Sequence, residues 1–145
     1  MTILISTCCI KNKKLPEILK IFKKNNLIDV ELSAGYYQKN LNKIISKFSN
    51  KMNLQTHNYF PVPKKPFVFN LASENPLIVS KSIKHAIKAI RISSRLNRKI
   101  YSFHAGYLID PSPKLLGKQF NIIEITDRNE ALKIFKKSVI LINKN

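Results

Sequence analysis

The 145-residue chain is poor in cysteine and glycine, and it has no tryptophan. Its two cysteines, Cys8 and Cys9, are neighbours in the sequence, a spacing that is poor geometry for a disulfide between them. A disulfide framework of the kind that holds small secreted domains together is therefore excluded. This cysteine usage is typical of a protein of the reducing cytoplasm.

Long hydrophobic runs are also missing. No apolar run approaches the roughly 18 to 20 residues that a membrane-spanning helix requires. The apolar start at residues 2–10 has neither a basic leader nor a small-residue cleavage site. The hydrophobic content of 44% is nevertheless enough for one packed core. We expect a single soluble, cytoplasmic domain over residues 1–145, with no membrane partner.

Acidic residues are scarce: 8 Asp and Glu stand against 26 Lys and Arg, which gives a formal net charge of +18. Such a surface attracts nucleic acid and phosphorylated metabolites. Part of the excess recurs at helical spacing on one outward face, at Lys81, Lys84, Lys88, Arg91 and Arg95. Aromatic residues for base stacking are not evident between these charges. We interpret the charge as compositional bias more than as a nucleic-acid surface, and nucleic acid is the less favoured partner.

Apolar and β-branched runs predict four strands, and 3.6-residue periodicity predicts four helices. The strands are expected at residues 3–8, 28–33, 52–57 and 100–103, and the helices at 15–25, 40–48, 76–97 and from 127 onward. Asp127 and Glu130 have the spacing of a capping box. Strand and helix therefore alternate four times, the pattern of an α/β fold in which helices cover a parallel sheet.

The scarcity of glycine also bears on function. Residues 8–11, which follow the first strand, contain no glycine, so the phosphate-binding loops of dinucleotide-binding folds and nucleotide triphosphatases lose their main support. Long proline-containing loops follow the third and fourth strands instead, the second of them over residues 105–126. In a (β/α)8 barrel, the loops at the carboxyl ends of the strands make the active site.

Three polar residues stand at predicted strand ends. His57 closes the third strand, His104 follows the fourth, and Glu31 lies near the end of the second. Because neighbouring parallel strands lie about 4.8 Å apart, equivalent end positions could aim two imidazoles at one ion or one sugar hydroxyl. We interpret His85 as an ordinary surface or core histidine. The residues expected to wall this mouth are aromatic, namely Tyr59, Phe60, Phe67 and Tyr107.

Several of these segments resemble one known family. They are Glu31-Leu32-Ser33, His57-Asn58-Tyr59 with Phe69-Asn70-Leu71-Ala72-Ser73, and Phe103-His104-Ala105-Gly106. In this order they are similar to the xylose-isomerase-like TIM barrels, which include sugar-phosphate isomerases and epimerases and the AP-site DNA repair enzyme endonuclease IV.

The resemblance implies a half-barrel: four βα units of a (β/α)8 TIM barrel, with parallel strands and outer helices. It implies a divalent metal ion (Mn, Mg, Co or Zn) at the barrel mouth. His57 and His104 would be metal ligands, or would bind substrate together with Glu31. In the isomerases the principal acids come from the fifth to eighth strands, which this sequence lacks, so the catalytic residues stay unknown.

Four βα units leave two strand edges open and an inner face that we expect to be apolar. We therefore expect the chain to be the amino-terminal half of a barrel. Its completing half-barrel would be the remainder of a longer chain, a second polypeptide or a second copy.

Three functions fit these observations. The first is a metal-dependent isomerase or epimerase of a sugar or sugar phosphate, which moves a proton through an enediolate and is inactive as this half alone. The second is a zinc-dependent AP-site endonuclease, and the third is a non-catalytic remnant or assembly subunit. The proline- and lysine-rich insertion at residues 61–66, and Ala105 where the repair enzyme favours Pro, favour the isomerase branch.

Overall fold

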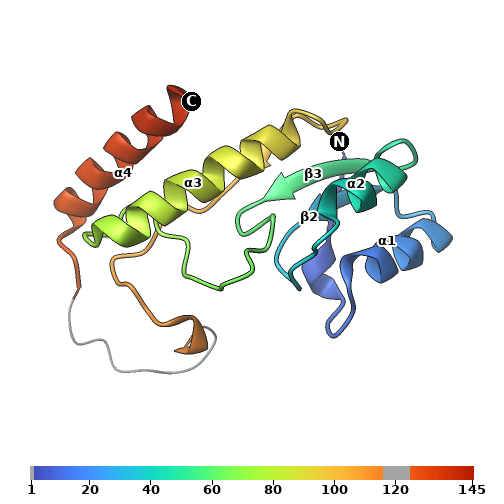
Figure 1. Ribbon diagram of the computed structural model, residues 1–145, viewed down its shortest axis with the longest axis horizontal. Helices are drawn as coiled ribbons and strands as arrows, with labels where there is room; N and C mark the ends of the chain where they lie inside the picture. Colours follow the sequence, from blue (N-terminus) through green and yellow to red (C-terminus); the bar gives the residue numbers. More distant parts are fainter. Residues whose placement is uncertain (1, 116–124) are drawn as a thin grey trace. The chain divides into compact units, whose positions relative to one another are not determined.

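A computed structural model describes residues 2–115 and 125–145, so part of the predicted loop at 105–126 lies outside the described residues (Figure 1). The described chain alternates strands and helices in an α/β arrangement, as the sequence predicts. The strands are β1 (Ile5–Ser6), β2 (Asp29–Leu32), β3 (Asn53–His57) and β4 (Tyr101–Ser102). The helices are α1 (Leu15–Lys24), α2 (Leu41–Ser49), α3 (Pro76–Ser93) and α4 (Arg128–Asn143), with short 3-10 turns at Thr7–Cys9 and Pro113–Leu115.

The strands form one parallel sheet in the order β1-β2-β3-β4. β1 and β4 are two-residue strands, shorter than the sequence predicts. At β1 the reason is local: the Ser6 hydroxyl accepts a hydrogen bond from the Cys8 N–H, which starts the 3-10 turn at Thr7–Cys9. None of the described helices combines the length and the apolar character needed to cross a membrane.

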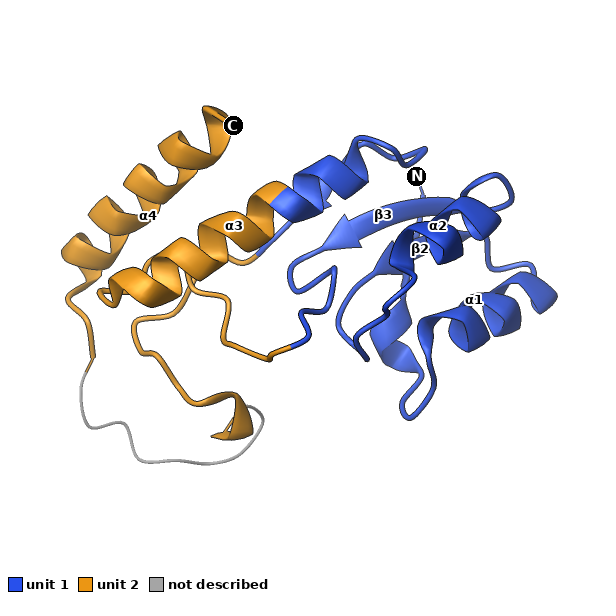
Figure 2. Ribbon diagram, in the orientation of Figure 1, with its two compact units in different colours: residues 1–64, 88–103 blue, residues 65–87, 104–145 orange. Residues whose placement is uncertain are grey.

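The chain divides into two compact units (Figure 2). The first unit comprises Met1–Lys64 and Lys88–Phe103, and it contains the sheet with α1 and α2. The second comprises Lys65–Ile87 and His104–Asn145, and it contains α4. α3 contributes residues to both units.

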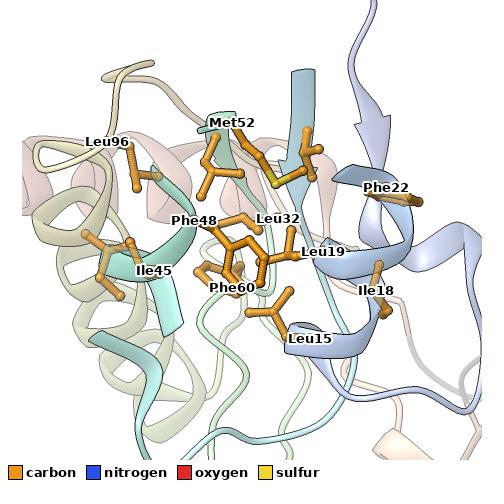
Figure 3. Packing of buried hydrophobic residues seen from close by; sticks show 13 residues of the cluster. Leu15, Ile18, Leu19, Phe22, Leu32, Ile45, Phe48, Met52, Phe60 and Leu96 are labelled. Atoms are coloured by element: carbon orange, nitrogen blue, oxygen red, sulfur yellow. The ribbon is translucent and has the colours of Figure 1, made fainter. Parts of the chain in front are cut away.

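The core of the first unit lies between one face of the sheet and the helices (Figure 3). Val30, Leu32 and Leu54 alternate along β2 and β3, and all three are fully buried. α1 covers them with an apolar stripe at the spacing of helix turns, Leu15, Ile18, Leu19 and Phe22. Burying a side chain of this size stabilises a fold by about 1.5–3 kcal/mol, so this stripe is what fixes α1 on the sheet.

The opposite face of the sheet is polar, and our expectation of an apolar inner face is wrong. Side chains alternate between the two faces along a strand, so the residues next to Val30, Leu32 and Leu54 point to this opposite face. Residues that pair with them in register on neighbouring strands point to the same face. All of them are polar: Ser6, Asp29, Glu31, Asn53, Gln55, His57 and Ser102. The strands of an all-parallel sheet buried on both faces read as continuous apolar runs, and these strands alternate instead.

The second unit is organised by the buried side chain of Asn70. Its amide nitrogen donates to the Tyr107 and Ile109 carbonyls and to Asp110 Oδ1, and its Oδ1 accepts from the N–H groups of Ala72 and Tyr107. Asn70 therefore ties the loop after β4 to the segment that precedes α3.

α4 joins this unit through a buried hydroxyl and begins at the predicted cap. Ser138 donates to the Leu71 carbonyl at 2.9 Å. The Asp127 carboxylate accepts the N–H groups of Asn129 and Glu130, so the predicted Asp127 cap is confirmed. The Ser138 contact is buried, so it satisfies polar groups that would otherwise lose hydrogen bonds on folding.

Candidate functional site

Polar side chains of β2, β3 and β4 meet where these strands end. The three strands are parallel, so their carboxyl ends share one edge of the sheet. Glu31 pairs in register with Gln55, two residues before His57, and His57 pairs with Ser102. Because side chains alternate along a strand, Glu31, His57 and Ser102 all point to the polar face. We call these three residues the strand-end cluster.

The imidazole of His57 is the centre of the strand-end cluster. Its Nδ1 lies 2.9 Å from Ser102 Oγ, a hydrogen bond in which either atom can be the donor, and 3.7 Å from Glu31 Oε2. The side chains of His57 and Glu31 are 23% and 25% exposed. They are therefore held by their neighbours and still open to a ligand.

A hydrogen-bonded backbone turn follows His57. The Asn58 N–H donates to the Ser102 carbonyl at 2.6 Å, and Asn58 adopts a positive φ of 40°, a conformation that asparagine tolerates better than most residues. The Tyr101 hydroxyl donates to the Asn58 carbonyl at 2.8 Å. Burial raises the pKa of the Tyr101 phenol above its ordinary value, so this donor keeps its proton at neutral pH.

Buried hydroxyl groups fix β3 from the other face. Thr56 and Ser93 are hydrogen-bonded to each other, and Ser93 Oγ also donates to the Ile100 carbonyl at 3.0 Å. Both side chains are almost fully inaccessible to solvent. They join β3, the end of α3 and the residue before β4, and so help to position His57, one residue after Thr56, and Ser102, two residues after Ile100.

An ion pair occupies the other end of the polar face. Arg98 Nη2 donates to Asp29 Oδ1 at 2.8 Å, and Asn53 Nδ2 donates to the same oxygen at 3.1 Å. The hydrogen bonds from Arg98 and Asn53 lower the pKa of Asp29 below its ordinary value. Asp29 is the first residue of β2, at the amino-terminal end of the strand, and we assign its carboxylate a structural role.

The structure brings together only some of the site residues that the sequence predicts. Glu31 and His57 lie close to each other. His104 follows β4 by two residues, is exposed and belongs to the second unit, so its pairing with His57 stays a prediction.

Two predictions about other site-region residues have clear outcomes. Phe60, expected at the mouth, is a buried member of the first unit's core, so that prediction is wrong. His85 is buried, and it contacts the rings of Phe67 and Phe69 edge to face, which agrees with its assignment as an ordinary core histidine.

Ser102 is the site residue that the sequence analysis missed. It lies in the segment that carries His104, but its partnership with His57 depends on the register between β3 and β4. The register of a strand as short as β4 cannot be predicted from its sequence. The sequence offers one signal for Ser102, a hydroxyl residue two positions before His104, and this pattern is too common to indicate a functional site.

The described residues do not build a metal site by themselves. No group of three or more His, Cys, Asp or Glu side chains within residues 2–115 and 125–145 could hold a metal ion. The strand-end cluster supplies one carboxylate and one imidazole, whereas catalytic zinc takes three protein ligands. A divalent metal therefore does not fit this part of the chain alone, and no chemical step is assigned to one.

The cluster can still bind and move protons. A carboxylate accepts hydrogen bonds from hydroxyl groups, an imidazole both donates and accepts, and a serine hydroxyl does either. Such a set of groups, close together on a half-exposed surface, suits a ligand with several neighbouring hydroxyl or carbonyl oxygens. Comparisons with protein-family models, curated proteins and solved structures gave no significant match to this chain.

Proposed function

We propose that the chain is the amino-terminal half of a (β/α)8 barrel whose complete form isomerises or epimerises a sugar or sugar phosphate. The observation that carries this proposal is the approach of Glu31 to His57 at the carboxyl ends of adjacent parallel strands. In barrels of this kind, the active site lies at that edge of the strands.

The polar face supports the same proposal. A strand row of Glu31, Gln55 and His57 suits the inside of a sugar site better than a second packed layer, because each residue offers hydrogen bonds. His57 and Glu31 would hold the substrate's hydroxyl groups and exchange a proton with them, as a general acid–base pair does. Ser102 would orient the imidazole through Nδ1.

In this proposal the other half of the barrel supplies further strands and the missing catalytic residues. β1 and β4 each pair with a single neighbour among the described strands, so both have an open edge for further strands. The principal catalytic acids, and the ligands that a divalent metal needs beyond Glu31 and His57, would come from that half. The chain alone is then a substrate-binding half-site without turnover.

Sugar binding by the chain alone tests the proposal. Saturation-transfer NMR with a panel of aldose and ketose phosphates would detect weak binding. Because charge-assisted hydrogen bonds are strong, we expect Glu31→Gln to weaken binding about tenfold. Glu17→Gln, which makes the same charge change at an exposed residue of α1, is the matched control and should leave binding unchanged.

Two outcomes contradict the proposal. One is equal binding by the Glu31→Gln variant and the wild type. The other is a metal-dependent cut at an abasic site in a DNA duplex that is lost in His57→Ala or His104→Ala, because this result would establish the AP-endonuclease alternative.

A further inference from the structure

A basic hollow lies on the helical side of the first unit. It has a volume of about 720 Å³ and is formed by the segment that leads into α2, the loop after β3 and the last part of α3. Five cationic side chains line it: Lys39, Lys43, Lys88, Arg91 and Arg95. None of the described lining residues is acidic, so the hollow is a local concentration of positive charge.

A second hollow of about 490 Å³ adjoins the first, because both include the residues from Tyr37 to Asn40 together with Lys43. It adds three further cations, Lys14, Lys20 and Lys47, and again no acid among its described lining residues. We call the two hollows together the basic groove. Its cations come from α1, α2 and α3, from residues that flank α1 and α3 (Lys14 and Arg95), and from the segment before α2. They are therefore spread along the surface and are not gathered at a single point.

The charges of the basic groove are not neutralised within the described chain. None of its eight cations is in a described ion pair, whereas Arg98 pairs with Asp29 and Lys133 pairs with Glu130 elsewhere. α2 begins in the groove with no acidic residue in its first turn and no side-chain cap, which adds the positive end of the helix dipole to the same field. A polyanion would supply the missing negative charge.

An aromatic side chain lines the groove together with these charges. Tyr37 lines both hollows and is 47% exposed, and its neighbour Tyr36 is 54% exposed. Tyr36 lines neither hollow, but an exposed aromatic ring such as that of Tyr37 within a basic groove is a surface on which an unpaired base stacks. Such an aromatic residue is not evident from the sequence, but Tyr37 shares both hollows with the basic side chains. The helical spacing of the cations is visible in the sequence, but the sequence does not show that residues 37–40 lie on the same surface.

The basic groove is separate from the strand-end cluster. Ile92 and Phe48 line the groove and belong to the core on the helical face of the sheet. Glu31 and His57 point to the opposite face. Neither of these two residues lines either hollow, and the inference does not depend on the proposed function.

We propose that the basic groove binds the phosphate backbone of a single-stranded nucleic acid, with an unpaired base stacked on Tyr37. A small phosphorylated compound has one or two phosphates and would leave most of the eight cations unmatched. A strand carries a phosphate at every nucleotide and matches a path of charges. Stacking on Tyr37 requires a base that is not already paired, which favours a single strand over a duplex.

Fluorescence anisotropy with labelled oligo-dT and oligo-U of about 12 nucleotides tests the proposal, since single-strand grooves cover roughly 4–16 nucleotides. Binding should weaken with salt, and Arg91→Ala with Arg95→Ala should reduce the slope of log K against log salt by about 1.4, or 0.7 for each phosphate contact. Tyr37→Ala should weaken binding about tenfold while Tyr37→Phe keeps it, because the ring and not the hydroxyl stacks.

The matched control is Lys136→Ala with Lys137→Ala, which removes the same charge from exposed residues of α4. It should leave the affinity within about twofold of the wild type, because neither lysine lines the groove and exposed charges that do not contact the ligand are screened by salt. Circular dichroism on every variant verifies folding.

Three results overturn the proposal. One is an equal loss of affinity in the α4 control and the groove variant, which would show diffuse attraction. Another is an affinity that does not rise with oligonucleotide length, or that inorganic phosphate abolishes at equal phosphate concentration, which would show a small-anion site. The last is equal or tighter binding of a duplex.

Discussion

Glu31 Oε2 and His57 Nδ1 lie 3.7 Å apart, on neighbouring strands and on the face of the sheet away from the hydrophobic core. Neither side chain is needed to fill that core, and both are about one-quarter exposed. A carboxylate and an imidazole in this position can act together on one ligand. Their neighbours, Ser102 and the backbone turn at Asn58, restrict where the imidazole lies.

The buried hydroxyl of Ser93 should matter more for stability than its exposed neighbour. Ser93→Ala removes the hydrogen bonds to Thr56 and to the Ile100 carbonyl, and we expect a loss of about 1–3 kcal/mol because buried polar groups are left unsatisfied. Ser94→Ala removes an exposed bond to the Arg91 carbonyl and should change stability by less than about 0.5 kcal/mol. Urea unfolding measures both. Equal effects would contradict the role assigned to Ser93.

Gly106 should tolerate alanine less well than Gly35. Both glycines have a φ near +149°, where a side chain is strained, and at such positions strain costs about 1–3 kcal/mol. A Cβ at Gly106 would also collide with Asn70 Oδ1, whereas a Cβ at Gly35 has nothing within 4 Å.

The readout for this pair is hydrogen exchange at Ala72 and Tyr107, because Asn70 Oδ1 accepts both of their N–H groups. Gly106→Ala should speed exchange at both amides, and Gly35→Ala at neither. Unchanged exchange in Gly106→Ala would contradict the role of Asn70 as the organiser of the second unit.

Tyr101 should make the first unit less stable at alkaline pH. Burial raises the folded-state pKa of Tyr101 above its ordinary value of 10.0, so between the two values the unfolded chain releases a proton that the folded chain keeps. The stabilisation is complete below pH 10.0 and declines as the pH rises above it. Tyr101→Phe should remove this decline and cost about 1 kcal/mol at neutral pH, because the bond to the Asn58 carbonyl is lost.

Denaturant unfolding on both sides of pH 10.0 measures the Tyr101 effect, with Tyr36→Phe at an exposed position as the control. The same alkaline decline in Tyr101→Phe and in the wild type would contradict it.

The sequence was sufficient for the order and type of the elements but not for the contacts between them. Alternation along β2 and the apolar stripe of α1 are local patterns, and both are found where they were predicted. The partnership of His57 with Ser102 depends on register between strands, and the burial of Phe60 depends on how the loop after β3 folds back. Long-range packing decides such features, and no local pattern records it.

The same reasoning explains why the basic groove was not foreseen. Lys88, Arg91 and Arg95 recur in the sequence at the spacing of a helix face, which is typical of a solvated surface, although α3 ends at Ser93, before Arg95. Only the folded chain places Lys39 and Tyr37 beside them. The sequence shows the regular spacing of the cations in and after α3, but it does not show that they form a concave surface with residues of other segments.

A double-mutant cycle between Glu31 and His57 in sugar-phosphate binding tests the central claim most directly. The cycle compares the wild type with Glu31→Gln, His57→Asn and the double variant, by titration calorimetry or NMR. If the two side chains act on one ligand, each single change weakens binding and the effects are coupled by about 0.5–3 kcal/mol. Additive effects, or an affinity unchanged in the single variants, would contradict the strand-end cluster as the sugar-binding half-site.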